Sequence, residues 1–176
     1  MGISPKITRA GFTIVELLIV IVVIAILAAI SVVAYTGIQN RANDTAVQSD
    51  IRNFASKVME FHAINGRYPL GYSGITGSTG VGPVEGISKF SLARGAYATD
   101  VYNFYYCQAD GDFVVGAVSK SGKRFYYRSG AGLSEYTGSW SGAAVNCTGM
   151  GLASGYTYSL AHNIVNGVGS WTAWSQ

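Results

Sequence analysis

The side chain that most constrains this sequence chemically is that of Glu16. It is the only charged residue in an apolar stretch that runs from Phe12 to about Ala34. A carboxylate within a helix of membrane length costs about 2.5–3.5 kcal/mol on insertion scales, so we expect a cationic partner for it. A cut between Gly11 and Phe12 would supply one, because it would free the amine of Phe12 close to Glu16 of a neighbouring copy.

The segment before this bond is short, polar and basic, with Lys6 and Arg9 as its charged residues. A secretory signal peptide places its apolar core before the cleavage site, and here that order is reversed. The basic residues are expected to hold residues 1–11 on the cytoplasmic side of a membrane. The apolar run 12–35 would be about 36 Å long as a helix, which exceeds a hydrocarbon core of about 30 Å. It predicts one membrane-spanning helix, and the alternative is a plain signal anchor with a stray glutamate.

The residues around the Gly11–Phe12 bond resemble the cleavage signature of type IV pilins and pseudopilins. The pattern reads Gly11-Phe12-Thr13-Ile14-Val15-Glu16-Leu17-Leu18-Ile19-Val20. The resemblance covers roughly residues 6–69. It implies that a prepilin peptidase cuts after Gly11 and methylates the new terminus at Phe12, and that Glu16 is the assembly glutamate. It also implies a homo-oligomeric helical filament, with an assembly ATPase and a membrane platform protein as partners.

The sequence departs from many pilins of that family at two positions. Those pilins carry a helix-breaking Gly and Pro at the places that correspond to Ala25 and Val33, and both breakers are absent here. Gly and Pro lower helix stability by about 1 and 3 kcal/mol, so this helix should be harder to melt on assembly. Gly37 is the remaining weak point, and we expect any local unwinding in a filament to centre on residues 31–37.

A second helical pattern follows the apolar run over residues 36–65. Its apolar residues are spaced four and three apart, which predicts a single apolar stripe on a continuing helix. The stripe consists of Val47, Ile51, Phe54, Val58 and Phe61. Among the charged residues, Asp50 is expected to pair loosely with Arg41 or Lys57. Gly66 and Pro69 end the pattern, so one helix should span about residues 12–64.

The remainder of the chain predicts a small antiparallel sheet. Tyr-, Phe- and Val-rich runs separated by Gly-containing turns indicate strands at residues 101–107, 112–119 and 123–128. A further strand is expected at 145–150 or at 156–160. The Gly-rich residues 71–86 predict a loop, and 87–92 could form a short helix or a strand. The fold class is therefore α+β, a long N-terminal helix packed on a small antiparallel sheet, with residues 66–176 as the globular domain.

The two cysteines, Cys107 and Cys147, lie in the C-terminal half of the chain. An even count in an exported chain favours one disulfide, and two buried free thiols are the alternative. The disulfide would close a loop of about forty residues, worth roughly 3–4 kcal/mol on the loop-entropy model.

The sequence predicts no enzyme, no metal site and no cofactor. Neither His62 nor His162 has a second ligand at metal-binding spacing. The run Asp110-Gly111-Asp112 is only a fragment of a calcium loop. Removal of residues 1–11 would lower the formal charge from +3 to +1, which argues against a dedicated nucleic-acid binder.

These observations favour a structural subunit, a major pilin, of a type IV pilus-like extracellular filament. Its precursor would lie in the cytoplasmic membrane with the C-terminal domain outside. Two alternatives remain: a minor pilin or pseudopilin of a secretion or DNA-uptake system, and a signal-anchored surface domain that binds a ligand as a monomer. Trp171 and Trp174 could form an adhesive surface, although such residues more often contribute to a core or a subunit contact.

Overall fold

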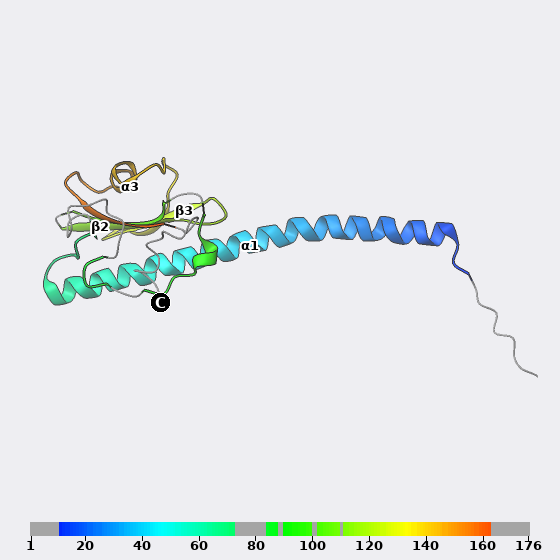
Figure 1. Cartoon of the computed structure of the whole chain (residues 1–176), viewed down its shortest axis with the longest axis horizontal. Helices are drawn as coiled ribbons and strands as arrows, with labels where there is room; N and C mark the ends of the chain where they lie inside the picture. The colour runs from blue at the N-terminus through cyan, green and yellow to red at the C-terminus, as the bar shows by residue number, and fades with distance from the viewer. Residues whose placement is uncertain (1–10, 73–83, 88–89, 100–101, 110, 163–176) are drawn as a thin grey trace, which may run out of the picture. The chain divides into compact units, whose positions relative to one another are not determined.

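A computed structural model describes residues 11–72, 84–87, 90–99, 102–109 and 111–162 of the chain (Figure 1). The chain divides into two compact units, residues 1–39 and residues 40–176. Most of the expected loop at 71–86 lies outside the described residues, as do residues 88–89 of the segment 87–92. Val84 and Ile87 form an isolated antiparallel bridge, and a short 3-10 helix, η1, follows at Arg94–Ala96.

The first element is helix α1, Ile14–Asn65, which continues without a break through Gly37. The expected helix over about residues 12–64 is confirmed. Gly66 ends it with a φ of 71°, and its N–H donates to the carbonyl of His62 at 2.8 Å. The hydroxyl of Ser31 donates back to the carbonyl of Leu27, a contact that often bends helices slightly. The unwinding expected over residues 31–37 concerns the filament and stays a prediction.

The sheet of the second unit contains five antiparallel strands in the order β4-β3-β2-β1-β5. Their bounds are β1 Tyr102–Ala109, β2 Asp112–Val118, β3 Arg124–Arg128, β4 Gly132–Glu135 and β5 Thr157–His162. The predicted three-stranded meander is confirmed by β1, β2 and β3. Of the two places considered for a further strand, 156–160 is right and corresponds to β5.

The other place, residues 145–150, is wrong as a strand because residues 145–149 belong to helix α3, Ala143–Gly149, and Met150 caps it. Helix α3 begins with two consecutive alanines, and alanine is the best helix former. The hydroxyl of Thr148 also donates to the carbonyl of Ala144 at 2.6 Å, within the helix. Strand β4, the short edge strand next to β3, was not predicted from the sequence.

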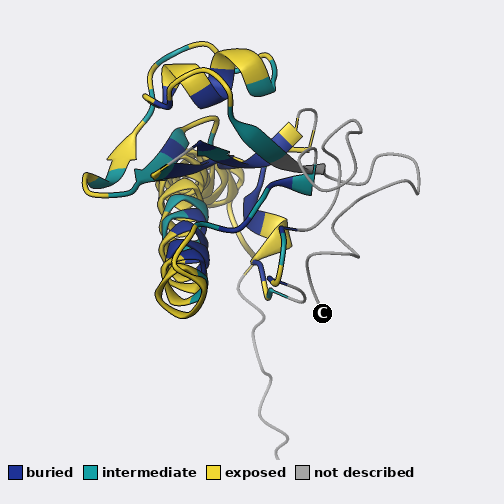
Figure 2. Cartoon of the chain, turned by 90° about the vertical axis from the view of Figure 1, so that its left-hand side faces the viewer, coloured by how far each residue is buried: buried dark blue, intermediate teal, exposed yellow. Residues whose placement is uncertain are grey.

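One face of the sheet packs against the second half of α1 (Figure 2). Val47, Ile51, Phe54 and Val58 of the predicted stripe are fully buried, whereas Phe61 is only half-buried. Phe54 lies at the centre of this core, where its ring makes edge-to-face contacts. Its partners, at centroid distances of 5.3, 5.2 and 5.8 Å, are Phe90, Phe104 and Tyr106. The apolar stripe therefore determines which face of the helix covers the sheet.

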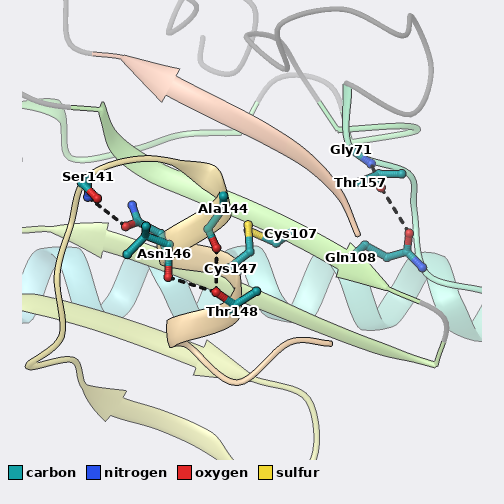
Figure 3. Close-up of a disulfide and its surroundings, with 10 residues drawn as sticks. Gly71, Cys107, Gln108, Ser141, Ala144, Asn146, Cys147, Thr148 and Thr157 are labelled. Atoms are coloured by element: carbon teal, nitrogen blue, oxygen red, sulfur yellow. Dashed lines mark hydrogen bonds between the residues drawn. A yellow bond between two sulfur atoms is a disulfide. The ribbon is translucent and has the colours of Figure 1, made fainter. Parts of the chain in front are cut away.

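The opposite face of the sheet carries a second core beneath α3 (Figure 3). The expected disulfide between Cys107 of β1 and Cys147 of α3 is present, with both residues fully buried and their Cα atoms 5.8 Å apart. Gly116 of β2 provides the space for this layer, because a Cβ there would lie 2.4 Å from Sδ of Met150. The disulfide thus ties the C-terminal region to the middle of the sheet.

Asp50 corrects an expectation, because it does not pair with Arg41 or Lys57. Its side chain is buried in the face of α1 that meets the sheet, and its Oδ2 accepts hydrogen bonds from the Ala93 N–H at 2.8 Å and the Tyr97 hydroxyl at 2.9 Å. Desolvation raises the pKa of Asp50, and the two hydrogen bonds oppose that shift without cancelling it. The carboxylate fastens the segment around η1 to the helix, while Lys57 pairs with Glu60 instead.

This raised pKa predicts a defined pH dependence for Asp50→Asn. The folded-state pKa lies above the unfolded value of about 3.9, so the wild-type protein gains stability relative to the variant as pH falls from 7 through the folded pKa. The gain should be complete below the unfolded pKa. Denaturant unfolding of both full-length proteins in detergent micelles, from pH 7 to pH 3, measures this difference. A difference that stays constant or shrinks with falling pH would contradict the assignment.

Candidate assembly site

The N-terminal end of α1 is held by a reciprocal pair of side chains, Thr13 and Glu16. Oε2 of Glu16 accepts hydrogen bonds from the Thr13 N–H at 2.8 Å and the Thr13 hydroxyl at 2.6 Å. The Glu16 N–H donates to Oγ1 of Thr13 at 3.2 Å. This is a capping box, in which two backbone donors of a helix start are satisfied by the two side chains.

The capping role of Thr13 was missed in the sequence, although its signal is present there. A Thr followed three residues later by Glu, directly before an apolar run, is the sequence pattern of a capping box. The box orients the Glu16 carboxylate toward the start of the helix. The hydrogen bonds described for Glu16 use Oε2, and an ionised carboxylate can accept several more. Glu16 can therefore hold its own helix start and still accept a cation.

Every residue from 11 to 42 is exposed in the single chain. Phe12 is 80% exposed, and the large apolar side chains that follow remain between 48% and 84% exposed. By length and composition α1 could cross a membrane. An apolar surface this continuous has to be covered by lipid or by protein. Glu16 lies at the N-terminal end of that surface.

The N-terminal region matches a known family description, the prokaryotic N-terminal methylation motif, over residues 7–32. The chain carries the type IV prepilin signature. The motif implies processing by a prepilin peptidase and assembly into a filament. The long helix with its small antiparallel sheet is an α+β arrangement like that of type IV pilins. No curated protein and no solved structure matches the chain.

The other candidate residues of this chain do not form a second chemical site among the described residues. Oδ2 of Asp112 accepts hydrogen bonds from Nε of Arg128 at 3.0 Å and from Nη2 at 2.8 Å, and Oδ1 accepts one from the hydroxyl of Ser129. Asp110 of the same run lies outside the described part of the chain. The ring of His62 stacks on Tyr68 at a centroid distance of 4.3 Å. No group of three potential metal ligands occurs in the described residues.

The structure thus brings Gly11, Phe12 and Glu16 together at one end of α1, whereas Cys107 and Cys147 lie in the second unit as a structural link. Trp171 and Trp174 fall outside the described residues, and so does the side chain of His162. A Cβ added to Gly11 would meet nothing within 4 Å, so the chain itself leaves room for a side chain there.

The capping box can be tested by comparing Thr13→Ala with Thr13→Ser. Loss of the hydroxyl should cost about 1 kcal/mol of local helix stability, so amide exchange in the first turn should be about fivefold faster in Thr13→Ala. Thr13→Ser keeps a hydroxyl and should exchange like the wild type. NMR-detected hydrogen exchange of the full-length chain in micelles measures this effect. Equal exchange in both variants would show that the Thr13 hydroxyl does not cap the helix.

Proposed function

We propose that this prepilin is a structural subunit, a major pilin, of a type IV pilus-like extracellular filament. The observation that carries the proposal is the exposed apolar surface of α1, which begins with the methylation motif and contains one carboxylate. A filament core built from copies of this helix would cover that surface. The peptidase would cut between Gly11 and Phe12 and so provide each copy with a free, methylated amine.

Two contributions dominate the free energy of moving this helix from lipid into a helix bundle, namely helix packing and the charge of Glu16. Lipid tails are as apolar as Val, Ile and Leu side chains, so the hydrophobic effect nearly cancels in the transfer. Close packing between helices contributes, and so does the charge of Glu16. An unpaired carboxylate is costly in a dry bundle, whereas a paired and hydrogen-bonded one is tolerated. The amine of Phe12 in an adjacent subunit would provide that pair.

The precursor would sit in the cytoplasmic membrane before assembly, with Lys6 and Arg9 on the cytoplasmic side and residues 40–176 outside. The apolar run of α1 supports this placement. An assembly ATPase and a membrane platform protein would extract the processed subunit, as the family resemblance implies. The mature chain has a formal side-chain charge near neutrality, and no specific nucleic acid is proposed as a partner.

Glu16→Ala tests the proposal directly. We expect the variant to be inserted and processed normally but to yield at least tenfold less protein in sheared surface filaments, because the amine of Phe12 loses its acceptor. Mass spectrometry of the sheared and membrane fractions gives both the amount and the N-terminus. Wild-type filaments should contain a chain that begins at a methylated Phe12.

Glu60→Ala is the matched control for this variant, since Glu60 lies on the same helix, is well exposed and forms a surface pair with Lys57. It should give filaments in normal yield. Normal filaments from Glu16→Ala would refute the pairing, and a wild-type chain that keeps Met1 and stays in the membrane would refute the filament. A low abundance in wild-type filaments would instead identify a minor component.

Gly11→Ala and Gly11→Leu test whether the peptidase requires a small residue before the cleaved bond. The chain itself would accommodate a Cβ at Gly11, so any loss of cleavage reflects the space in the peptidase pocket. We expect Gly11→Ala to be cleaved nearly as well as the wild type and Gly11→Leu to accumulate uncut. Immunoblots of membrane fractions resolve the two forms. Equal cleavage of the two variants would show that residue size at this position is not what the peptidase selects.

A further inference from the structure

Four cations belong to two segments of the second unit, the start of its part of α1 and the turn between β2 and β3 with the first residue of β3. Arg41 follows Ile38, an exposed apolar residue, by three positions. The turn between β2 and β3 contacts α1 close to Arg41, because the Ser121 hydroxyl donates to Oδ1 of Asp44. Arg41 and Asp44 are three positions apart on one face of α1. The turn carries Lys120 and Lys123, both exposed.

Lys120 and Arg124 line one wall of a cleft of about 580 Å³, which Ala98, Thr99 and Trp140 complete. The Lys120 N–H donates to the carbonyl of Ala96 at 2.7 Å, which fixes the turn against η1. Nη1 of Arg124 donates to the carbonyl of Gly138 and so holds the guanidinium in place beside the cleft. We call Arg41, Lys120, Lys123 and Arg124 the cationic surface.

Two carboxylates bond to the cationic surface or to its turn. Asp44 accepts the Ser121 hydroxyl, and Glu135 lies 3.2 Å from Nζ of Lys123. Both side chains of the second pair are about half exposed, so water screens their attraction strongly. Asp100 lies outside the described residues. The four cations outnumber the two carboxylates that bond to them or to their turn.

Amphipathic aromatic residues flank the cationic surface. Nε1 of Trp140 donates to the carbonyl of Tyr102 at 2.7 Å, and Tyr102 is 40% exposed at the start of β1. Trp and Tyr are enriched where protein meets lipid headgroups, because their rings are apolar and their polar groups reach water. Exposed cations are attracted to the phosphate groups of anionic lipids.

We propose that the cationic surface binds the phosphate groups of anionic lipid headgroups while the precursor is still in the bilayer. The inference rests on the membrane-anchored precursor of the proposed function. The peptide link from Gln39 to Arg41 joins the cationic surface directly to the membrane-length run. Exposed cations that lie within about 8 Å of anionic headgroups are only partly screened at physiological salt. Extraction into a filament would break these lipid contacts.

Lysine footprinting tests this proposal on the full-length, uncut chain in vesicles. Brief acetylation followed by mass spectrometry measures each lysine separately in neutral phosphatidylcholine and in vesicles that also contain phosphatidylglycerol. We expect acetylation of Lys120 and Lys123 to fall at least threefold with the anionic lipid and to recover at about 1 M salt, where the Debye length is about 3 Å. Lys57 is the internal control, because it is exposed and paired much like Lys123. Its acetylation should not change.

Two helix variants sharpen the measurement. Arg41→Gln removes a charge of the cationic surface and should weaken the protection of Lys120 and Lys123. Arg52→Gln removes an exposed charge of α1 outside that surface and should leave the protection intact. Equal acetylation of Lys120 and Lys123 in both kinds of vesicle would overturn the proposal. An equal fall in the acetylation of Lys57 would also overturn it, and so would equal loss of protection in Arg41→Gln and Arg52→Gln.

Two further measurements complete the experiment. One tests whether a free anion can replace the lipid headgroup, and the other tests whether the chain is anchored in the membrane. Inorganic phosphate added to neutral vesicles should not protect the lysines, and equal protection by it would replace the lipid with a free anion. A chain that fails to float with either vesicle would overturn the membrane-anchored precursor together with this inference. Neither cleavage nor polymerisation enters the assay. A loss of filaments in cells is therefore distinguishable from a loss of lipid binding.

Discussion

An acidic side chain at the start of an apolar helix is the constraint on which the proposed processing and assembly of this chain depend. Glu16 is stabilised in the single chain by Thr13, which satisfies the helix start but supplies no positive charge. In water or near lipid headgroups, these hydrogen bonds are sufficient to keep the Glu16 carboxylate stable, because the solvent compensates its charge. In a dry bundle of helices the carboxylate also needs a cation. In the proposed filament, removal of the leader would create one at Phe12, so the same cut that shortens the chain would make the helix compatible with assembly.

The second unit has to satisfy a different requirement. Its core must be stable although residues 11–42 of the chain are exposed. One face of α1 provides Val47, Ile51, Phe54 and Val58 to the sheet, and the disulfide holds a further layer on the opposite face. Asp50 adds a buried polar contact between the helix and the segment at η1. Burial disfavours its charge, so this contact favours a defined arrangement at some expense of stability at neutral pH.

Much of this structure follows from local patterns in the sequence. The spacing of apolar residues predicts the long helix and its buried stripe, and Tyr- and Val-rich runs between glycine turns predict β1, β2 and β3. The buried state of Asp50 could not be predicted, because its partners Ala93 and Tyr97 are more than forty residues away. Similarly, β4 has few strand-forming residues and depends on pairing with β3. The Thr13–Glu16 box is local and was predictable, whereas a contact of Glu16 with another copy is absent from any single chain.

A density map of the assembled filament that resolves side chains would test the pairing of Glu16 most directly. We predict that the nitrogen of Phe12 in one subunit lies within about 4 Å of the Glu16 carboxylate of a neighbour, the usual limit for an ion pair. A map in which Glu16 contacts only its own Thr13, with no cationic group at that distance, would contradict this prediction.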